Sequence, residues 1–88
     1  MHEPEQERRE ECRREVRRYL WERSAVALRP AAIRRGLDRE YGFTEREITD
    51  ALAFLASDKQ AAIEPDDLGA TEYFKITAEG IRRHERGK

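Results

Sequence analysis

Three side chains carry the nitrogen or sulfur atoms that metal sites and thiol or imidazole catalysis use, namely His2, Cys12 and His84. No two of them stand at the spacing of a metal site. The sequence has no glycine-rich phosphate loop and no serine–histidine–aspartate arrangement. His2 and His84 stand among polar residues, as surface histidines do. We therefore expect no enzyme activity, no metal and no cofactor.

The remaining chemistry of the sequence is charge, because 42% of its 88 residues are Asp, Glu, Lys or Arg. The formal net charge is only −1, yet the charges are segregated. Residues 1–43 carry 11 basic and 9 acidic side chains, whereas residues 44–75 carry 3 basic and 8 acidic ones. Residues 76–88 are again basic, with 4 against 2. A nucleic-acid partner would therefore have to accommodate an acidic middle segment.

The length and the apolar pattern predict one small domain outside the membrane. The longest apolar run, residues 51–56, is far below the ~20 residues that span a bilayer, and the N-terminus lacks the apolar stretch of a secretory signal. A single cysteine cannot form an internal disulfide, which suits a reducing compartment. We expect a cytoplasmic protein with a charged, frayed tail at residues 1–10 and a domain at residues 11–86.

A first helix is predicted from residue 5 to about residue 24. Cys12, Val16 and Leu20 recur at the spacing of one helical face. Trp21 lies off that face, so its indole either covers a neighbouring loop or contacts a partner. Residues 24–28 could end this helix and form a very short strand.

Two further helices are predicted at residues 30–41 and 44–57, joined by a tight turn. Pro30 suits a first helical turn, and Gly42 suits the left-handed position that ends a helix. Thr44 and Glu47 form the pattern of a capping box at the start of the next helix. Gly36, inside the first of these helices, suggests that another backbone passes close by.

The periodicity then changes to that of a hairpin followed by a last helix. Residues 60–64 and 73–77 are predicted as strands around an acidic loop, and residues 78–86 as a helix capped by Thr77. The expected fold class is α+β, mainly helical with one small hairpin. The order is helix, short strand, helix, helix, strand, loop, strand, helix.

This order, the glycine in the turn and the stretch YFKITAEGI at residues 73–81 resemble the winged helix-turn-helix family. The similarity covers roughly residues 12–84 and is greatest to small bacterial and phage regulators related to MarR and PadR. The resemblance implies a DNA-binding transcriptional regulator and a homodimer. It places helix 44–57 in the major groove of double-stranded DNA and the arginines of helix 30–41 on phosphates.

The resemblance assigns roles by position. The base-reading side and the start of helix 44–57 would comprise Thr44, Arg46, Thr49, Ala53 and Ser57, with Asp50 among them. Phosphate contacts would fall to Arg29, Arg34, Arg35 and Arg39. The dimer or partner contact would include Cys12, Val16 and Trp21.

The charges also permit a second interpretation. Asp50 stands four residues after Arg46 and could occupy its guanidinium, and Asp66 and Asp67 place carboxylates in the hairpin loop. The arginines of helix 30–41 could also be an ordinary solvated face. The alternative function is a winged-helix module that binds a protein and does not read DNA.

Overall fold

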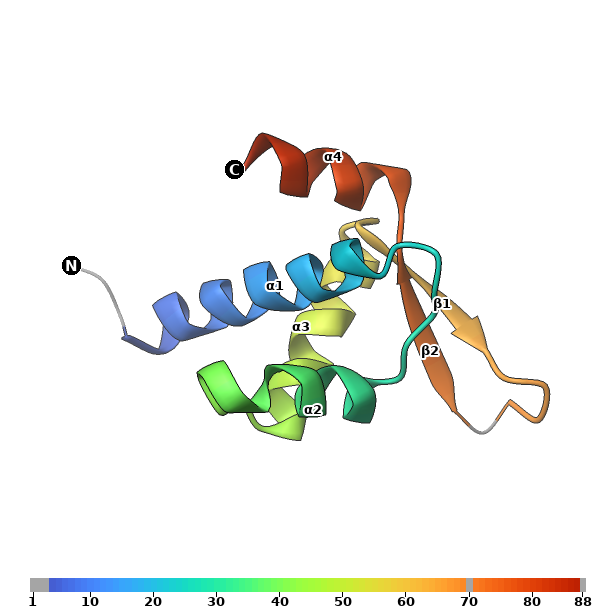
Figure 1. Ribbon diagram of the computed structural model, residues 1–88, viewed down its shortest axis with the longest axis horizontal. Coiled ribbons are helices and arrows are strands. Elements are labelled where there is room, and N and C mark those ends of the chain that lie inside the picture. The colour runs from blue at the N-terminus through green and yellow to red at the C-terminus, as the bar shows by residue number, and fades with distance from the viewer. Residues whose placement is uncertain (1–3, 70, 88) are drawn as a thin grey trace.

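A computed structural model describes residues 4–69 and 71–87, with the side chain of Arg39 outside that description. These residues form four helices and one antiparallel hairpin (Figure 1). The elements are α1 (Pro4–Glu22), α2 (Pro30–Tyr41), α3 (Glu45–Ser57), β1 (Ala61–Pro65), β2 (Glu72–Ile76) and α4 (Ala78–Arg86). The predicted α+β class and element order are confirmed.

The core lies where α1, α2 and α3 meet. Each helix contributes the apolar side of an amphipathic pattern, with Leu20, Leu37 and Leu52 fully buried between them. Burying a side chain of this size stabilises the fold by about 1.5–3 kcal/mol. The helix α4 lies along α1, and the hairpin projects from the helical body (Figure 1).

Local sequence signals fix the turn between α2 and α3. Gly42 has φ 62°, and its N–H donates to the Asp38 carbonyl at 3.2 Å. A residue with a Cβ would be strained in this left-handed conformation. The Thr44 hydroxyl then accepts a hydrogen bond from the Glu47 N–H at 3.1 Å, and the Thr44 N–H donates to the Glu47 carboxylate at 2.9 Å. The capping box predicted from the sequence is present.

The hairpin is joined to the helical body at its base. Strand β1 pairs with β2 from Ala61↔Ile76 to Pro65↔Glu72. The predicted short strand is a single bridge, in which Leu28 and Phe74 exchange two backbone hydrogen bonds of 2.8 and 2.7 Å. Phe74 and Ile76 are buried against the helices, as their shared face predicts.

The start of α1 differs from the expected frayed tail. Residues 4–10 form its first turns, and Arg8 donates to both carboxylate oxygens of Glu47, one of them at 3.0 Å. This contact spans 39 positions in the sequence, so no local pattern indicates it. Residues 1–3 lie outside the described residues, and the division into tail and domain stays a prediction.

Two further expectations require correction. His84, expected on the surface, is only 8% exposed, because its ring lies 4.7 Å from that of Trp21. Trp21 therefore covers α4 rather than a loop. Gly36 accommodates the ring of Tyr19 and not a passing backbone. It is Gly80 whose neighbour is a backbone group, the Gln60 carbonyl.

Candidate nucleic-acid interface

The exposed side of α3 carries the residues predicted to read bases. Ile48, Leu52 and Leu55 are buried, so the opposite side of the helix faces outward. The outward-facing residues are Arg46, Thr49, Asp50, Ala53 and Ser57, all of them exposed. The amphipathic pattern of α3 therefore brings these predicted residues onto one surface.

The Arg46 guanidinium is available on this surface. In the described part of the chain, its side chain takes part in no ion pair or hydrogen bond, and the pairing with Asp50 that their spacing permits is absent. Thr44 differs, because its hydroxyl oxygen already accepts the Glu47 N–H in the capping box. Its hydroxyl hydrogen is the part that could still meet a partner.

The arginines that precede α2 or lie in its middle also lack nearby carboxylates. Arg29 and Arg35 are exposed, and Arg34 is half-buried, with its Nε shielded from solvent and lacking a hydrogen-bond partner. By contrast, Arg18 on α1 binds Glu15 at 2.7 Å and Glu22 at 2.9 Å. The positive charges of Arg29, Arg34 and Arg35 are therefore not compensated by a paired carboxylate among the described residues. Arg39 lies on α2, but its side chain is outside the described residues.

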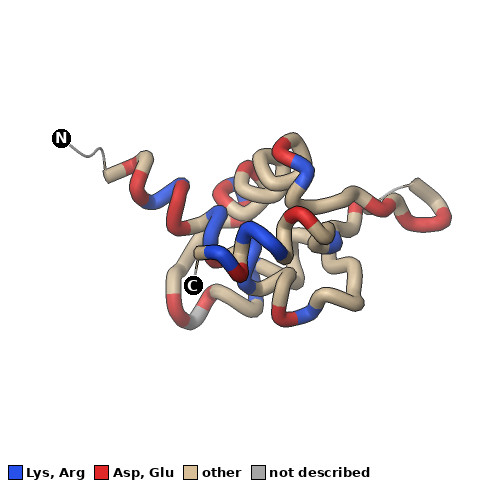
Figure 2. The backbone as a smooth tube through the Cα atoms, turned by 90° about the horizontal axis from the view of Figure 1, so that it is seen from above, with Lys and Arg blue, Asp and Glu red and all other residues tan. Residues whose placement is uncertain are grey.

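The hairpin presents the opposite charge. Carboxylates follow its outer half, and the sequence has no Lys or Arg between Gln60 and Phe74. Figure 2 shows the acidic segments along this projecting loop. Leu68, at the tip, is 90% exposed. A duplex would be repelled by this loop and attracted by the arginines of α2.

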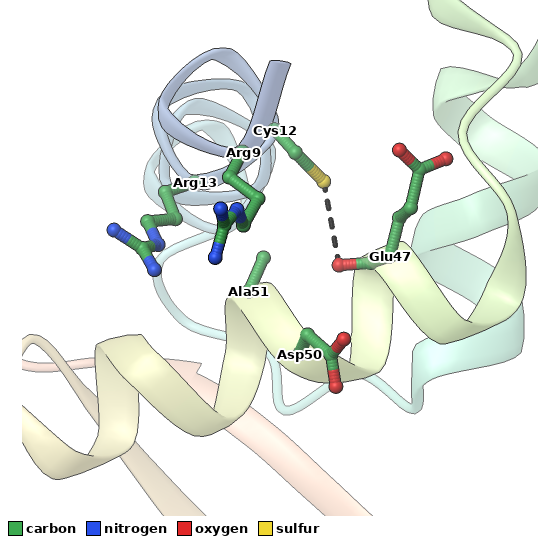
Figure 3. Close-up of a pocket in the computed structure, with 6 residues that line it drawn as sticks. All are labelled: Arg9, Cys12, Arg13, Glu47, Asp50 and Ala51. Atoms are coloured by element: carbon green, nitrogen blue, oxygen red, sulfur yellow. Dashed lines mark hydrogen bonds between the residues drawn. The ribbon is translucent and has the colours of Figure 1, made fainter. Parts of the chain in front are cut away.

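Two of the predicted partner contacts are corrected by the structure. Cys12 and Val16 are 2% and 0% exposed, because they pack inside the chain's own core. The Cys12 thiol donates to the Glu47 carbonyl at 3.5 Å (Figure 3). Burial raises the pKa of this thiol to about 11, so Cys12 is neutral at physiological pH. Trp21 is half-buried on His84, and its contact with a partner stays a prediction.

Sequence reasoning missed the arginines of α1 that border α3. Arg9 and Arg13 extend from α1 toward Asp50 and Ala51 and line a small cavity of about 50 Å³ with them (Figure 3). The Arg13 guanidinium also stacks on the Phe54 ring, 3.8 Å from its centroid. The four-residue spacing of these arginines was visible in the sequence. Which helix they face is decided only by tertiary packing.

Two other kinds of site are absent from the described ranges. Across residues 4–69 and 71–87, His, Cys, Asp and Glu form no group of three suited to a metal ion. In the same ranges, every helix is too short or too polar to cross a membrane.

Comparison with known proteins identifies a similar fold. Neither a protein-family model nor a curated protein matches the sequence. The crystal structure of the adhesin competence repressor (AdcR) from Streptococcus pyogenes is similar, with a TM-score of 0.62 and 17% sequence identity. The match covers 83% of this chain and 55% of that one, so this chain spans about half the length of the repressor. The similarity shows that this chain has a winged-helix fold.

Proposed function

We propose that the chain is a DNA-binding transcriptional regulator of bacterial or phage type, which inserts α3 into the major groove. The observation that most directly supports this proposal is the exposed face of α3, where Arg46 has no acidic partner among the described residues. Arg46 would bind guanine with two hydrogen bonds, and Thr49 and Ala53 would contact thymine methyl groups. The fold shared with a protein named as a repressor supports this assignment.

The arginines of α2 would position the domain on the phosphate backbone. Arg29, Arg34 and Arg35 lack carboxylates within 4.0 Å in the described structure. One copy offers few such contacts, so binding as a homodimer to two half-sites would double them. We place the protein in the cytoplasm and assign it no enzyme activity and no cofactor.

The acidic hairpin supports a second candidate function. Its tip combines the 90% exposed Leu68 with neighbouring carboxylates. Such a tip is unsuited to a phosphate backbone but suited to a basic protein surface with an apolar pocket. In this alternative, the domain is a protein-interaction module that does not read DNA.

A mobility-shift experiment on genomic fragments at two salt concentrations separates the two functions. A regulator should bind a specific duplex, and its affinity should fall steeply with salt. Arg46→Ala should cost about 1–3 kcal/mol and relax the sequence preference. Arg35→Ala should weaken all duplexes alike and reduce the salt slope by about 1 per copy bound.

Arg86→Ala is the matched control. Arg86 is an exposed arginine at the end of α4, and its loss changes the net charge equally without touching α2 or α3. The affinity of the Arg86→Ala variant for DNA should stay near that of the wild type. If no duplex binds at low salt, the DNA-binding proposal is refuted and the interaction module is favoured.

A further inference from the structure

A groove with a volume of about 300 Å³ lies away from the α2 arginines, between α1 and the end of α3. Four arginines line it, three from α1 and one from α4, which lies along α1 (Figure 1). They are Arg13, Arg14, Arg17 and Arg83. Phe54 and Leu55 of α3 add an apolar wall.

The positive charges in this groove are only partly compensated. Glu10 and Asp58 are its two carboxylates, so cations exceed anions by two. Asp58 is already engaged, since it accepts a hydrogen bond from Gln60 at 2.7 Å and lies 3.7 Å from Arg83. Arg13 and Arg17 have no carboxylate within 4.0 Å in the described part of the chain.

Arg17 occupies the most crowded position. Its Nη1 donates to the Gln60 side chain at 3.0 Å, while its Nε is buried without a hydrogen-bond partner. Burial lowers the pKa of this guanidinium, and the positive charges of Arg83 and Arg14 lower it further. A buried donor without an acceptor, surrounded by like charges, is costly to the fold. An anion in the groove would offset the like charges around Arg17.

We propose that this groove binds a small anionic molecule, one that carries a phosphate or carboxylate group on a short apolar part. The anion would accept charge-assisted hydrogen bonds from Arg17 and Arg83, which strengthen where water is partly excluded. The apolar part would lie against the part of Phe54 that Arg13 leaves uncovered, since Phe54 is 39% exposed beside that guanidinium. Such a ligand would bridge α1, α3 and α4. This inference does not depend on DNA binding.

The test is thermal unfolding of the full chain with increasing phenyl phosphate at constant ionic strength, with inorganic phosphate in parallel. A ligand of the folded state raises the unfolding midpoint in a saturable way. We expect phenyl phosphate to bind more tightly than inorganic phosphate. Arg17→Gln should weaken its affinity on the order of tenfold, the value of a hydrogen bond to a charged group.

Arg83→Gln provides a second variant in case Arg17→Gln impairs folding, because Arg83 is more exposed. It should also weaken the affinity. Arg35→Gln, an equal change of charge on α2, should leave it unchanged. The proposal would be overturned if phenyl phosphate does not raise the unfolding midpoint or if the rise does not saturate. It would also be overturned if all three variants reduce the rise equally.

The same anion chemistry could also come from a DNA phosphate. Mobility shifts with Arg17→Gln and Arg83→Gln distinguish the two sources. If both variants weaken duplex binding while phenyl phosphate does not stabilise the wild type, the groove serves DNA and the small-molecule proposal is refuted. Unchanged duplex binding together with saturable stabilisation supports it.

Discussion

Replacing Gly80 with alanine should destabilise the domain, although the change favours helix formation. The added Cβ would clash with the Gln60 carbonyl oxygen and would lie 2.7 Å from Ile76 Cγ1. The Gln60 carbonyl cannot move away from the added Cβ without loss, since it accepts a hydrogen bond from the Thr77 N–H at 3.0 Å. In addition, the Gln60 N–H donates to the Leu55 carbonyl at 2.8 Å. The close approach of α4 therefore requires glycine at this position.

The size of the effect follows from three contributions. Alanine gains about 1 kcal/mol of helix propensity over glycine. Overpacking against a fixed backbone costs about 1–3 kcal/mol, and losing the hydrogen bond from Thr77 costs about 1 kcal/mol more. The net loss should be about 1–3 kcal/mol. For a domain of this size, each kcal/mol lowers the melting temperature by about 4–8 °C.

Gly36→Ala is the matched control for this experiment. Its added Cβ would meet the outer end of the Tyr19 ring, and that half-buried side chain can rotate away. The change should alter stability by less than about 1 kcal/mol, because helix propensity offsets the displaced ring. Urea denaturation followed by circular dichroism measures both variants. If Gly80→Ala equals or exceeds the wild type in stability, or if Gly36→Ala is the more damaging, the reasoning is refuted.

Three further predictions concern the core and the start of α3. Leu52→Ala should cost about 2–5 kcal/mol in urea denaturation, because it leaves a cavity where all three helices meet; a loss below 1 kcal/mol would contradict the packing described. The hydrogen bond from Arg8 lowers the pKa of Glu47 from its ordinary 4.5. The ionised Glu47 carboxylate therefore stabilises the folded state fully above pH 4.5, and this stabilisation is lost as pH falls through the lowered pKa. The difference in unfolding free energy between wild type and Glu47→Gln should accordingly narrow below pH 4.5. A difference that widens there would contradict the lowered pKa of Glu47. Cys12, with a pKa of about 11, should react with thiol reagents at pH 8 only after unfolding, whereas a fast reaction in the folded protein would show that the thiol is accessible.

Local signals made most of the fold predictable. Pro30, Gly42 and the Thr44–Glu47 capping box each act over a few residues, and they predict the helix-turn-helix segment to within one residue of its observed bounds. The exposed side of α3 followed from the same periodicity. For these elements, sequence and structure agree because the residues that determine each helix end lie within a few positions of it in the chain.

The unpredicted features depend on distant residues. Arg8 meets Glu47, Arg17 meets Gln60, and His84 is covered by Trp21. No spacing rule links such pairs, so the charged groove and the buried histidine could not be anticipated. Periodicity also does not determine whether a helical stripe faces the core or a partner. The burial of Val16 in the chain's own core therefore could not be derived from the sequence.

The contact between Trp21 and His84 gives the protein an internal fluorescence reporter. Trp21 is the only tryptophan in the sequence, and its indole lies at the junction of α1 and α4. Its emission therefore records whether the last helix is docked, without any added dye. Separation of that helix from the rest of the domain would shift the emission to longer wavelength as water reaches the indole. Partial opening at the C-terminal end could thus be distinguished from global unfolding.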